Sequence, residues 1–304
     1  MKKLGSNHQT NYNMKHVIRL FLVFHILALS TYLVSAQQII SLYSDSIPNS
    51  IGKLNIAEKP TLEMYLPVSG NISGTSVIIF PGGAYAFLAY SEEGTIIAKA
   101  FAERGITTFV VKYRLPKNQT MIDKSLGPLM DAQKAIQLVR SKALQWNLDP
   151  KKIGIIGYSA GGHLASTLGT HFNKSYILNP ENINLRPDFM ILVYPVISME
   201  DNLTHMGSRI SLLGMEPSKD RVELFSNELQ VTGDTPPTYL THSGDDNLVD
   251  VNNSIVFYQA LQKKGVDAEL HLFPKGNHGF TQRLPVNEWL EPMLRFMKKE
   301  GFYN

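Results

Sequence analysis

The segment Gly157-Tyr158-Ser159-Ala160-Gly161 is the first part of this chain whose residue types and spacing indicate chemistry. It fits the pattern G-x-S-x-G, in which a serine lies on a tight turn between a strand and a helix. An apolar run precedes it at residues 153–156, and residues 160–170 are rich in helix formers. Small flanking residues leave the Ser159 hydroxyl exposed at the carboxyl end of the strand, so we predict that Ser159 is a nucleophile.

A serine hydroxyl needs a base to accept its proton, and histidine commonly serves as that base. His278 follows the last predicted strand and lies between glycines in the segment Gly276-Asn277-His278-Gly279. An imidazole on such a loop can reach inward, so we predict that His278 is the general base. His163 is four residues beyond Ser159, one helical turn further on, and we expect it to pack against or orient the turn.

Two adjacent aspartates, Asp245 and Asp246, are candidates for the carboxylate that orients the base. Both follow a predicted strand at residues 238–241. We choose Asp246, which stands three residues before Val249, and keep Asp245 as the alternative. The order Ser159, Asp246, His278, with gaps of 87 and 32 residues, is the order of α/β-hydrolases.

A negative oxygen that develops during acyl transfer needs backbone N–H donors held in place beforehand. The segment Pro81-Gly82-Gly83-Ala84-Tyr85 follows an early strand and allows the backbone to approach a ligand closely. We assign the donors to the amides of Ala160 and of Gly83 or Ala84. Tyr85 comes directly after this loop, and we expect its side chain to line the substrate pocket, with packing in the core as the alternative.

Apolar runs that alternate with helical patterns predict the elements that must hold these residues. Strands are expected at residues 77–80, 107–111, 153–156, 189–193, 238–241 and 270–273, and helices at 96–101, 132–146, 160–170, 255–261 and 289–296. We expect Pro292 to weaken the start of the last helix. The alternation predicts an α/β fold, with a mostly parallel twisted sheet and helices on both faces.

Two other features are open to structural interpretation. Residues 199–236 are less regular, and they form either a lid over one end of the sheet or a surface insertion. Arg114 and Asp131 are candidates for a structural ion pair.

The composition excludes several classes of protein. The chain has 304 residues, 43% hydrophobic and 18% charged, and it contains no cysteine. This excludes a disulfide scaffold, a thiolate metal site and a cysteine nucleophile, and the balance is that of a globular protein. No repeat with a period of 20 to 50 residues is visible, which argues against propellers and solenoids.

Residues 1–36 are predicted to be a cleavable signal peptide. Four basic residues precede an apolar run at residues 20–34, which ends in Ser35 and Ala36. The run is too short for a stable membrane span; a buried N-terminal helix or a retained anchor is the alternative. Without this leader the chain has 25 Lys and Arg against 26 Asp and Glu, so we expect no nucleic-acid or membrane-surface partner.

The chain resembles the α/β-hydrolase carbohydrate esterases, chiefly the secreted acetyl-xylan-esterase-like and feruloyl-esterase-like enzymes, in the segments PGGAY, GYSAGGHLA, PPTYL, SGDDNLV and GNHGF. The likeness extends from about Thr61 to the end of the chain. It implies an α/β-hydrolase fold, the removal of acyl groups, most often acetyl, from plant cell-wall polysaccharide, and the site roles assigned above. One departure is Ala84, where such families often have a third glycine.

These patterns together predict a single catalytic domain over residues 37–304 that acts as a secreted or periplasmic serine esterase. Its partner would be an acylated oligosaccharide or polysaccharide, and the chemistry needs no metal or organic cofactor. The alternatives are a feruloyl or small-ester carboxylesterase, a serine peptidase and a non-catalytic glycan-binding protein. Cleavage of the xylan backbone is disfavoured, because two adjacent aspartates on one loop are not expected to flank a sugar ring.

Overall fold

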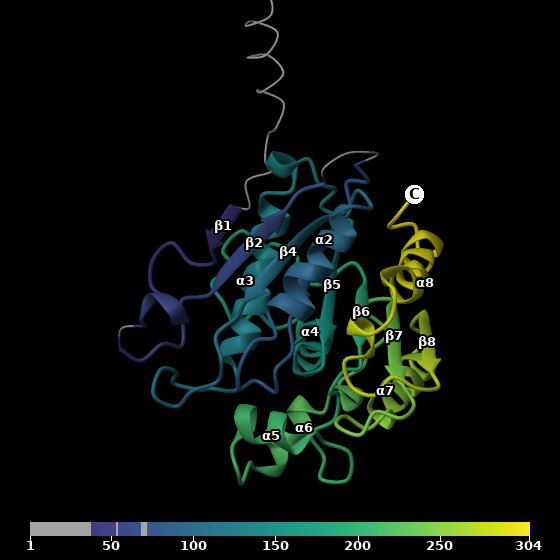
Figure 1. The fold of residues 1–304 in the computed structure, drawn as a ribbon. Helices are drawn as coiled ribbons and strands as arrows, with labels where there is room; N and C mark the ends of the chain where they lie inside the picture. The colour runs from purple at the N-terminus through teal and green to yellow at the C-terminus, as the bar shows by residue number, and fades with distance from the viewer. Residues whose placement is uncertain (1–37, 53, 68–71) are drawn as a thin grey trace, which may run out of the picture. The chain divides into compact units, whose positions relative to one another are not determined.

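An eight-stranded sheet forms the centre of the computed structural model, which describes residues 38–52, 54–67 and 72–304 (Figure 1). The strands lie in the order β1-β2-β4-β3-β5-β6-β7-β8. Their bounds are β1 Gln38–Ser41, β2 Thr61–Tyr65, β3 Ser76–Phe80, β4 Thr107–Lys112, β5 Ile153–Tyr158, β6 Met190–Val193, β7 Thr238–Ser243 and β8 Ala268–Phe273. All pairs from β4 across to β8 are parallel, which confirms the predicted sheet.

The two strands at the β1 edge were not predicted from the sequence. Strand β1 pairs antiparallel with β2, and β2 pairs antiparallel with β4. Strand β2 contains Glu63, which interrupts the apolar pattern of the segment. The tertiary structure compensates for this charge, because the Tyr90 hydroxyl donates a hydrogen bond to Glu63 Oε2 at 2.7 Å.

Helices cover both faces of the sheet, as predicted. Helices α3 (Gly127–Ser141), α4 (Ala160–His171) and α7 (Asn252–Lys263) share one hydrophobic core with the sheet. Helices α2 (Ile96–Ala102) and α8 (Val286–Lys299) share a second core. Strand β3 contributes to both cores, because its side chains alternate: Ile78 and Phe80 lie in the first, and Val77 and Ile79 in the second.

Two predicted helices differ in detail from the observed ones. The helix expected at residues 132–146 ends at Ser141, and a separate 3₁₀ turn, Leu144–Trp146, follows it. The chain reverses here to enter β5, with Asn147 in the left-handed region at φ 56°. Helix α8 continues through Pro292, because burial of its apolar side chains, Trp289 and Met293 among them, outweighs the lost hydrogen bond.

Residues 199–236 contain the short helices α5 (Met206–Leu213) and α6 (Lys219–Phe225), which lie below the sheet in the view of Figure 1, and the 3₁₀ turn η4 (Asn227–Leu229). This segment is bonded to the rest of the fold. The Lys124 ammonium donates to the Ser211 carbonyl at 2.8 Å, and Arg221 forms an ion pair with Asp123.

The predicted pair of Arg114 and Asp131 is present and buried. The guanidinium donates to both carboxylate oxygens at 2.8 to 3.1 Å, and the Arg114 amide donates to Oδ2 at 2.8 Å. Because Arg114 lies two residues beyond the end of β4 and Asp131 lies in α3, the confirmed ion pair fixes that helix to the sheet.

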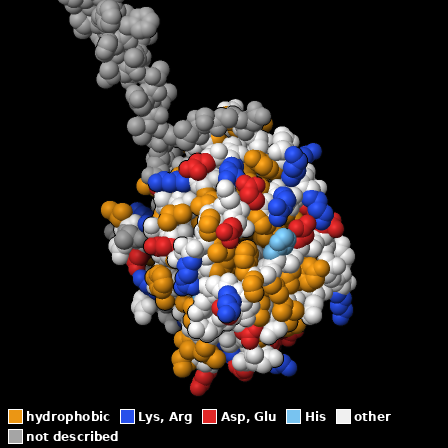
Figure 2. Space-filling model, turned by 45° about the vertical axis from the view of Figure 1, so that its right-hand side comes forward, with side chains coloured by type: hydrophobic (Ala, Val, Ile, Leu, Met, Phe, Trp, Pro, Cys, Tyr) orange, Lys and Arg blue, Asp and Glu red, His pale blue; other side chains and the backbone are white. Residues whose placement is uncertain are grey.

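On the face shown in Figure 2, basic and acidic side chains are interspersed and hydrophobic side chains lie in several groups. Within the described ranges, no helix is long and apolar enough to cross a membrane. All described residues belong to one unit, Gln37–Asn304. The predicted signal peptide, residues 1–36, lies outside the described residues.

Candidate active site

Ser159 lies on the tight turn between β5 and α4. Its backbone has φ 52° and ψ −119°, a conformation that costs energy for any residue with a side chain. The turn needs glycine at both ends. A Cβ on Gly157 would lie 2.2 Å from the Gly161 carbonyl oxygen, and one on Gly161 would lie 2.1 Å from the Phe80 carbonyl oxygen. The G-x-S-x-G pattern therefore reflects close backbone packing around the serine.

The structure brings Ser159, His278 and Asp246 together from the carboxyl ends of β5, β8 and β7. The distance from Ser159 Oγ to His278 Nε2 is 3.0 Å, and the distance from His278 Nδ1 to Asp246 Oδ2 is 2.7 Å. Both are hydrogen-bond distances, so the imidazole can accept the serine proton at one nitrogen while the other donates to the carboxylate.

The surroundings of Asp246 favour its charged form. Oδ1 accepts hydrogen bonds from the amides of Leu248 and Val249 at 2.9 and 3.0 Å, and His242 Nε2 lies 3.2 Å from Oδ2. Burial acts to raise the pKa of Asp246, but the bonds from His242, His278 and the Val249 amide together lower it far below its usual range.

The two adjacent aspartates have different partners. Asp245 accepts from the Ser243 hydroxyl at 2.6 Å and from the Asn277 amide at 2.7 Å, both through Oδ1. It thus ties the β7 loop to the loop that carries His278. Of the two candidates, Asp246 contacts the imidazole.

His242 was not identified from the sequence, although it lies at the end of β7. Its Nε2 is 3.0 Å from the Val249 carbonyl oxygen, which can only accept, so Nε2 carries the proton. Nδ1 then accepts from the Ser254 hydroxyl at 2.8 Å. His242 therefore supplies a second N–H to Asp246.

The turn after β3 lies against the nucleophile. Gly83, Ala84 and Tyr85 have φ values of 119°, 54° and 58°, and a Cβ on Gly82 would lie 2.9 Å from Ser159 Cβ. In the described part of the chain, the amides of Gly83, Ala84 and Ala160 have no hydrogen-bond acceptor. The prediction assigns the oxyanion donors to Ala160 and to one of Gly83 and Ala84, and all three amides are free to donate.

Tyr85 does not lie where the sequence prediction expects it. It is 2% exposed and packs in the core, and its hydroxyl lies 2.9 Å from His163 Nδ1. The left-handed backbone at Ala84 and Tyr85 directs the side chain inward. This burial argues against contact between the phenol and substrate.

His163 packs behind the turn, as expected. Its Nε2 lies 2.8 Å from the Phe225 carbonyl oxygen, so this nitrogen donates and Nδ1 accepts from Tyr85. Burial lowers the pKa of His163 to about 4. A neutral His163 thus joins the turn after β3 to residues 199–236.

Glu93 and Tyr194 also contact the site and were not identified from the sequence. Glu93 lies in the short π-helix Ser91–Thr95 and accepts a hydrogen bond from the Gly82 amide at 2.7 Å. The Tyr194 ring lies 4.7 Å from the His278 ring, centre to centre. No local motif marks Glu93, whereas Tyr194 directly follows β6 at the edge of the sheet where such residues gather.

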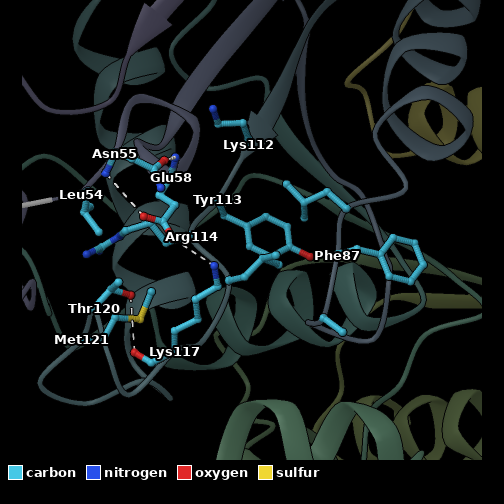
Figure 3. A pocket seen from close by; sticks show the side chains of 13 residues that line it. Leu54, Asn55, Glu58, Phe87, Lys112, Tyr113, Arg114, Lys117, Thr120 and Met121 are labelled. Atoms are coloured by element: carbon cyan, nitrogen blue, oxygen red, sulfur yellow. Dashed lines mark hydrogen bonds and ion pairs between the residues drawn. The ribbon is translucent and has the colours of Figure 1, made fainter.

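A pocket of about 470 Å³ adjoins the turn after β3 (Figure 3). Phe87 forms part of one wall of this pocket and is bonded to the turn, because its amide donates to the Gly83 carbonyl at 3.1 Å. In the view of Figure 3, Tyr113 lies between Phe87, which is 59% exposed, and the ion pair of Glu58 and Lys117. Leu54, Leu115 and Met121 supply apolar surface.

Comparison with known proteins decides the family. Residues 62–261 match BD-FAE. The chain belongs to this family of α/β-hydrolase esterases. This membership confirms the resemblance predicted from the motifs.

Two curated relatives of this BD-FAE chain have names connected with xylan. The chain is 36% identical over 231 residues to the acetylxylan esterase of Xylanibacter ruminicola, and the aligned region covers 75% of the chain and 45% of the relative. It is 36% identical over 224 residues to endo-1,4-beta-xylanase B of Butyrivibrio fibrisolvens, and that aligned region covers 73% of the chain and 35% of the relative. The chain thus spans less than half the length of either relative.

Solved structures agree with the BD-FAE assignment. The acetyl ester-xyloside bifunctional hydrolase from Caldicellulosiruptor lactoaceticus is 37% identical with a TM-score of 0.79, covering 90% of this chain and all of that one. The carboxylesterase Cest-2923 from Lactobacillus plantarum is 22% identical with a TM-score of 0.65, covering 83% and 97%, and it supports the fold alone. The predicted α/β-hydrolase fold is confirmed.

Proposed function

We propose that this BD-FAE protein is a serine esterase that removes O-acyl groups, chiefly acetyl, from plant cell-wall polysaccharide such as xylan. The observation that carries the proposal is the hydrogen-bonded series from Ser159 through His278 to Asp246. A strained serine turn, a histidine and a buried carboxylate, held by three different strands, are what acyl transfer through a serine requires.

The proposed reaction has two halves. Ser159 Oγ attacks the ester carbonyl carbon as His278 Nε2 accepts the hydroxyl proton, and Asp246 stabilises the imidazolium through Nδ1–H. The amides of Ala160 and of Gly83 or Ala84 donate to the oxyanion. The bond to the sugar oxygen then breaks as His278 returns the proton to that oxygen, and a water activated by His278 releases the acid from the acyl-enzyme.

The proposed substrate class is supported by the names of the relatives and by the pocket beside the turn. A sugar ring has an apolar face and an edge of hydroxyl groups. The pocket offers matching chemistry, with apolar side chains such as Leu54 and Leu115 and a polar pair, Glu58 and Lys117. Its volume of about 470 Å³ falls in the range of small-molecule sites.

Cleavage of the glycosidic backbone is a second activity named among the relatives, and the adjacent aspartates do not favour it here. A glycosidase uses two carboxyl groups on either side of the scissile bond. Asp246 is bonded to His278 and Asp245 to the Asn277 amide, so this pair is already engaged in the esterase geometry.

Export is also part of the proposal: residues 1–36 direct secretion and are then removed. The basic start, the apolar run and the small residues Ser35 and Ala36 support it. N-terminal sequencing of protein recovered outside the cytoplasm tests it, with a mature start at Gln37 expected and an intact leader as the contrary result.

The test of activity is acetate release from acetylated xylan by the purified protein, beside its Ser159→Ala variant and a feruloylated substrate. We expect acetate release that disappears in the variant. If short synthetic esters are hydrolysed but no acid is released from either polymer, the serine mechanism stands and the assignment of a polysaccharide substrate is overturned. Undiminished release by Ser159→Ala would overturn the serine mechanism itself.

A further inference from the structure

Glu93 is a buried carboxylate that accepts two hydrogen bonds close to the active site. It is 5% exposed, and no Lys or Arg of the described residues pairs with it. Oε2 accepts from the Gly82 amide at 2.7 Å, and Oε1 accepts from the Tyr194 hydroxyl at 3.1 Å. A buried carboxylate with two hydrogen-bond donors and no paired Lys or Arg is unusual, because burying a charge without an oppositely charged partner is costly.

The first hydrogen bond fixes the turn that carries the proposed oxyanion donors. Gly82 directly precedes Gly83 and Ala84, and a Cβ at Gly82 would lie 2.6 Å from Glu93 Oε2 and 2.9 Å from Ser159 Cβ. The carboxylate, the turn and the nucleophile are therefore packed against one another. Movement of Glu93 would move the donors relative to Ser159.

The second hydrogen bond leads to the catalytic histidine. The Tyr194 hydroxyl lies 3.2 Å from Thr281 Oγ1, three residues beyond His278, and the Tyr194 ring packs on the His278 ring at 4.7 Å. The Tyr194 backbone is held in the left-handed region at φ 37°, which strains a residue of this size. Glu93 thus lies at one end of a contact series that reaches the imidazole.

We propose that Glu93 is a positioning residue that couples the oxyanion turn to His278. One carboxylate holds the Gly82 amide and, through Tyr194 and its own negative charge, stabilises His278 in the charged form that the reaction requires. This inference rests on the proposed roles of Ser159 and His278.

The direction of the expected pH effect follows from the charges around these groups. His278 interacts with Asp246, Glu93 and His205, and Glu93 with Glu92 and the buried tyrosines Tyr113, Tyr158 and Tyr194. Removal of the Glu93 charge makes the imidazolium less favourable. The acid limb of the kcat/KM profile, which reports protonation of the base, therefore moves to lower pH.

The test is Glu93→Gln, which keeps the shape of the side chain and removes its charge, with Glu92→Gln as the exposed neighbouring control. We expect the acid limb for p-nitrophenyl acetate hydrolysis to move down by about 0.5 to 1 pH unit. We also expect kcat to fall roughly 10- to 100-fold, with KM within about threefold of wild type. Glu92→Gln is expected to retain the wild-type profile and kcat.

An unchanged acid limb in folded Glu93→Gln protein would overturn the proposal whatever its kcat, because a purely structural role does not change how the base titrates. If Glu93→Gln does not fold, Tyr194→Phe keeps the ring and removes the hydroxyl. The Tyr194 hydroxyl lowers the pKa of Glu93, so its loss leaves less negative charge on Glu93 when His278 is protonated. We then expect kcat to fall and the acid limb to move in the same direction, and an unmoved limb overturns the proposal. Failure of the proposed function is separate, since wild type and Ser159→Ala would then have equal activity.

Discussion

At the scale of single residues, two neighbouring aspartates differ in the groups that their carboxylates contact. Asp246 lies against His278 with its other oxygen held by the amides of Leu248 and Val249, and hydrogen bonds keep its pKa far below the usual range. Asp245 instead accepts from the Asn277 amide. Under the proposed mechanism, only the first carboxylate holds the imidazole in the tautomer that accepts the serine proton.

We therefore expect Asp246→Asn to lower kcat by roughly 10³- to 10⁴-fold, because an amide can hold the wrong tautomer of His278. Asp245→Asn is the matched control, and we expect a loss below about tenfold, since its Oδ1 can still accept from the Asn277 amide. Steady-state hydrolysis of p-nitrophenyl acetate measures both. Equal losses in the two variants would contradict the assignment of Asp246.

Tyr85 tests whether the side chain after the oxyanion turn has a structural role. Tyr85→Phe removes the hydroxyl that donates to His163 Nδ1 and leaves that buried nitrogen with only the Thr167 hydroxyl, at 3.5 Å. We expect a loss of about 1 to 2 kcal/mol in the free energy of unfolding, with an unchanged KM for acetylated oligosaccharide. Urea denaturation and initial rates measure these quantities. A raised KM at unchanged stability would instead favour contact with substrate.

At the scale of elements, the pair of Arg114 and Asp131 fixes helix α3 to the end of β4. Asp131 is fully buried, and without the guanidinium it would keep the Tyr43 hydroxyl, at 2.9 Å, and the residue 114 amide as donors. Breaking a buried pair leaves an uncompensated charge, which costs far more than loss of an exposed pair.

Accordingly, we expect Arg114→Ala to lower the free energy of unfolding by about 3 to 5 kcal/mol. Arg104→Ala removes the partly exposed pair with Glu291 and is expected to cost less than about 1 kcal/mol. Urea unfolding at pH 7 compares the two. Similar losses of unfolding free energy in the two variants would contradict this prediction and mean that other donors or water replace the Arg114 guanidinium.

At the scale of the whole molecule, buried ionisable groups predict how stability changes with pH. Burial lowers the pKa of His163 to about 4, whereas the unfolded side chain titrates near 6.5. The unfolded chain binds more protons between these values, so stability falls as the pH drops through that window. The raised pKa of Glu93, caused chiefly by burial, acts in the opposite direction, because the folded chain then binds the extra proton.

The pKa difference of His163 between the folded and unfolded chains lowers the free energy of unfolding by roughly 3 kcal/mol between pH 6.5 and pH 4. His163→Gln removes the titrating group, and we expect it to flatten the dependence of the unfolding free energy on pH by about 1 kcal/mol per pH unit. His271→Gln, on the edge strand β8, serves as the control. Urea unfolding at several pH values between 4.5 and 7.5 measures the slopes, and an unchanged slope in His163→Gln would contradict the prediction.

The sequence by itself determined the parts whose physical cause is local. Short runs rich in apolar and β-branched residues gave the parallel strands to within two residues, because buried strands are built mainly from such side chains. The serine turn was readable for the same reason, since only glycine fits at positions 157 and 161. The order Ser159, Asp246, His278 also followed from motif and strand positions alone.

Only the tertiary structure decided which side chains meet. The contacts of Asp246, the burial of Tyr85 and the bond from Gly82 to Glu93 join segments that are not adjacent in the chain. The antiparallel strands β1 and β2 likewise depend on partners elsewhere, such as Tyr90 for Glu63. A side chain's direction depends on the hydrogen bonds and packing of both segments that meet, and neither segment's sequence contains that information.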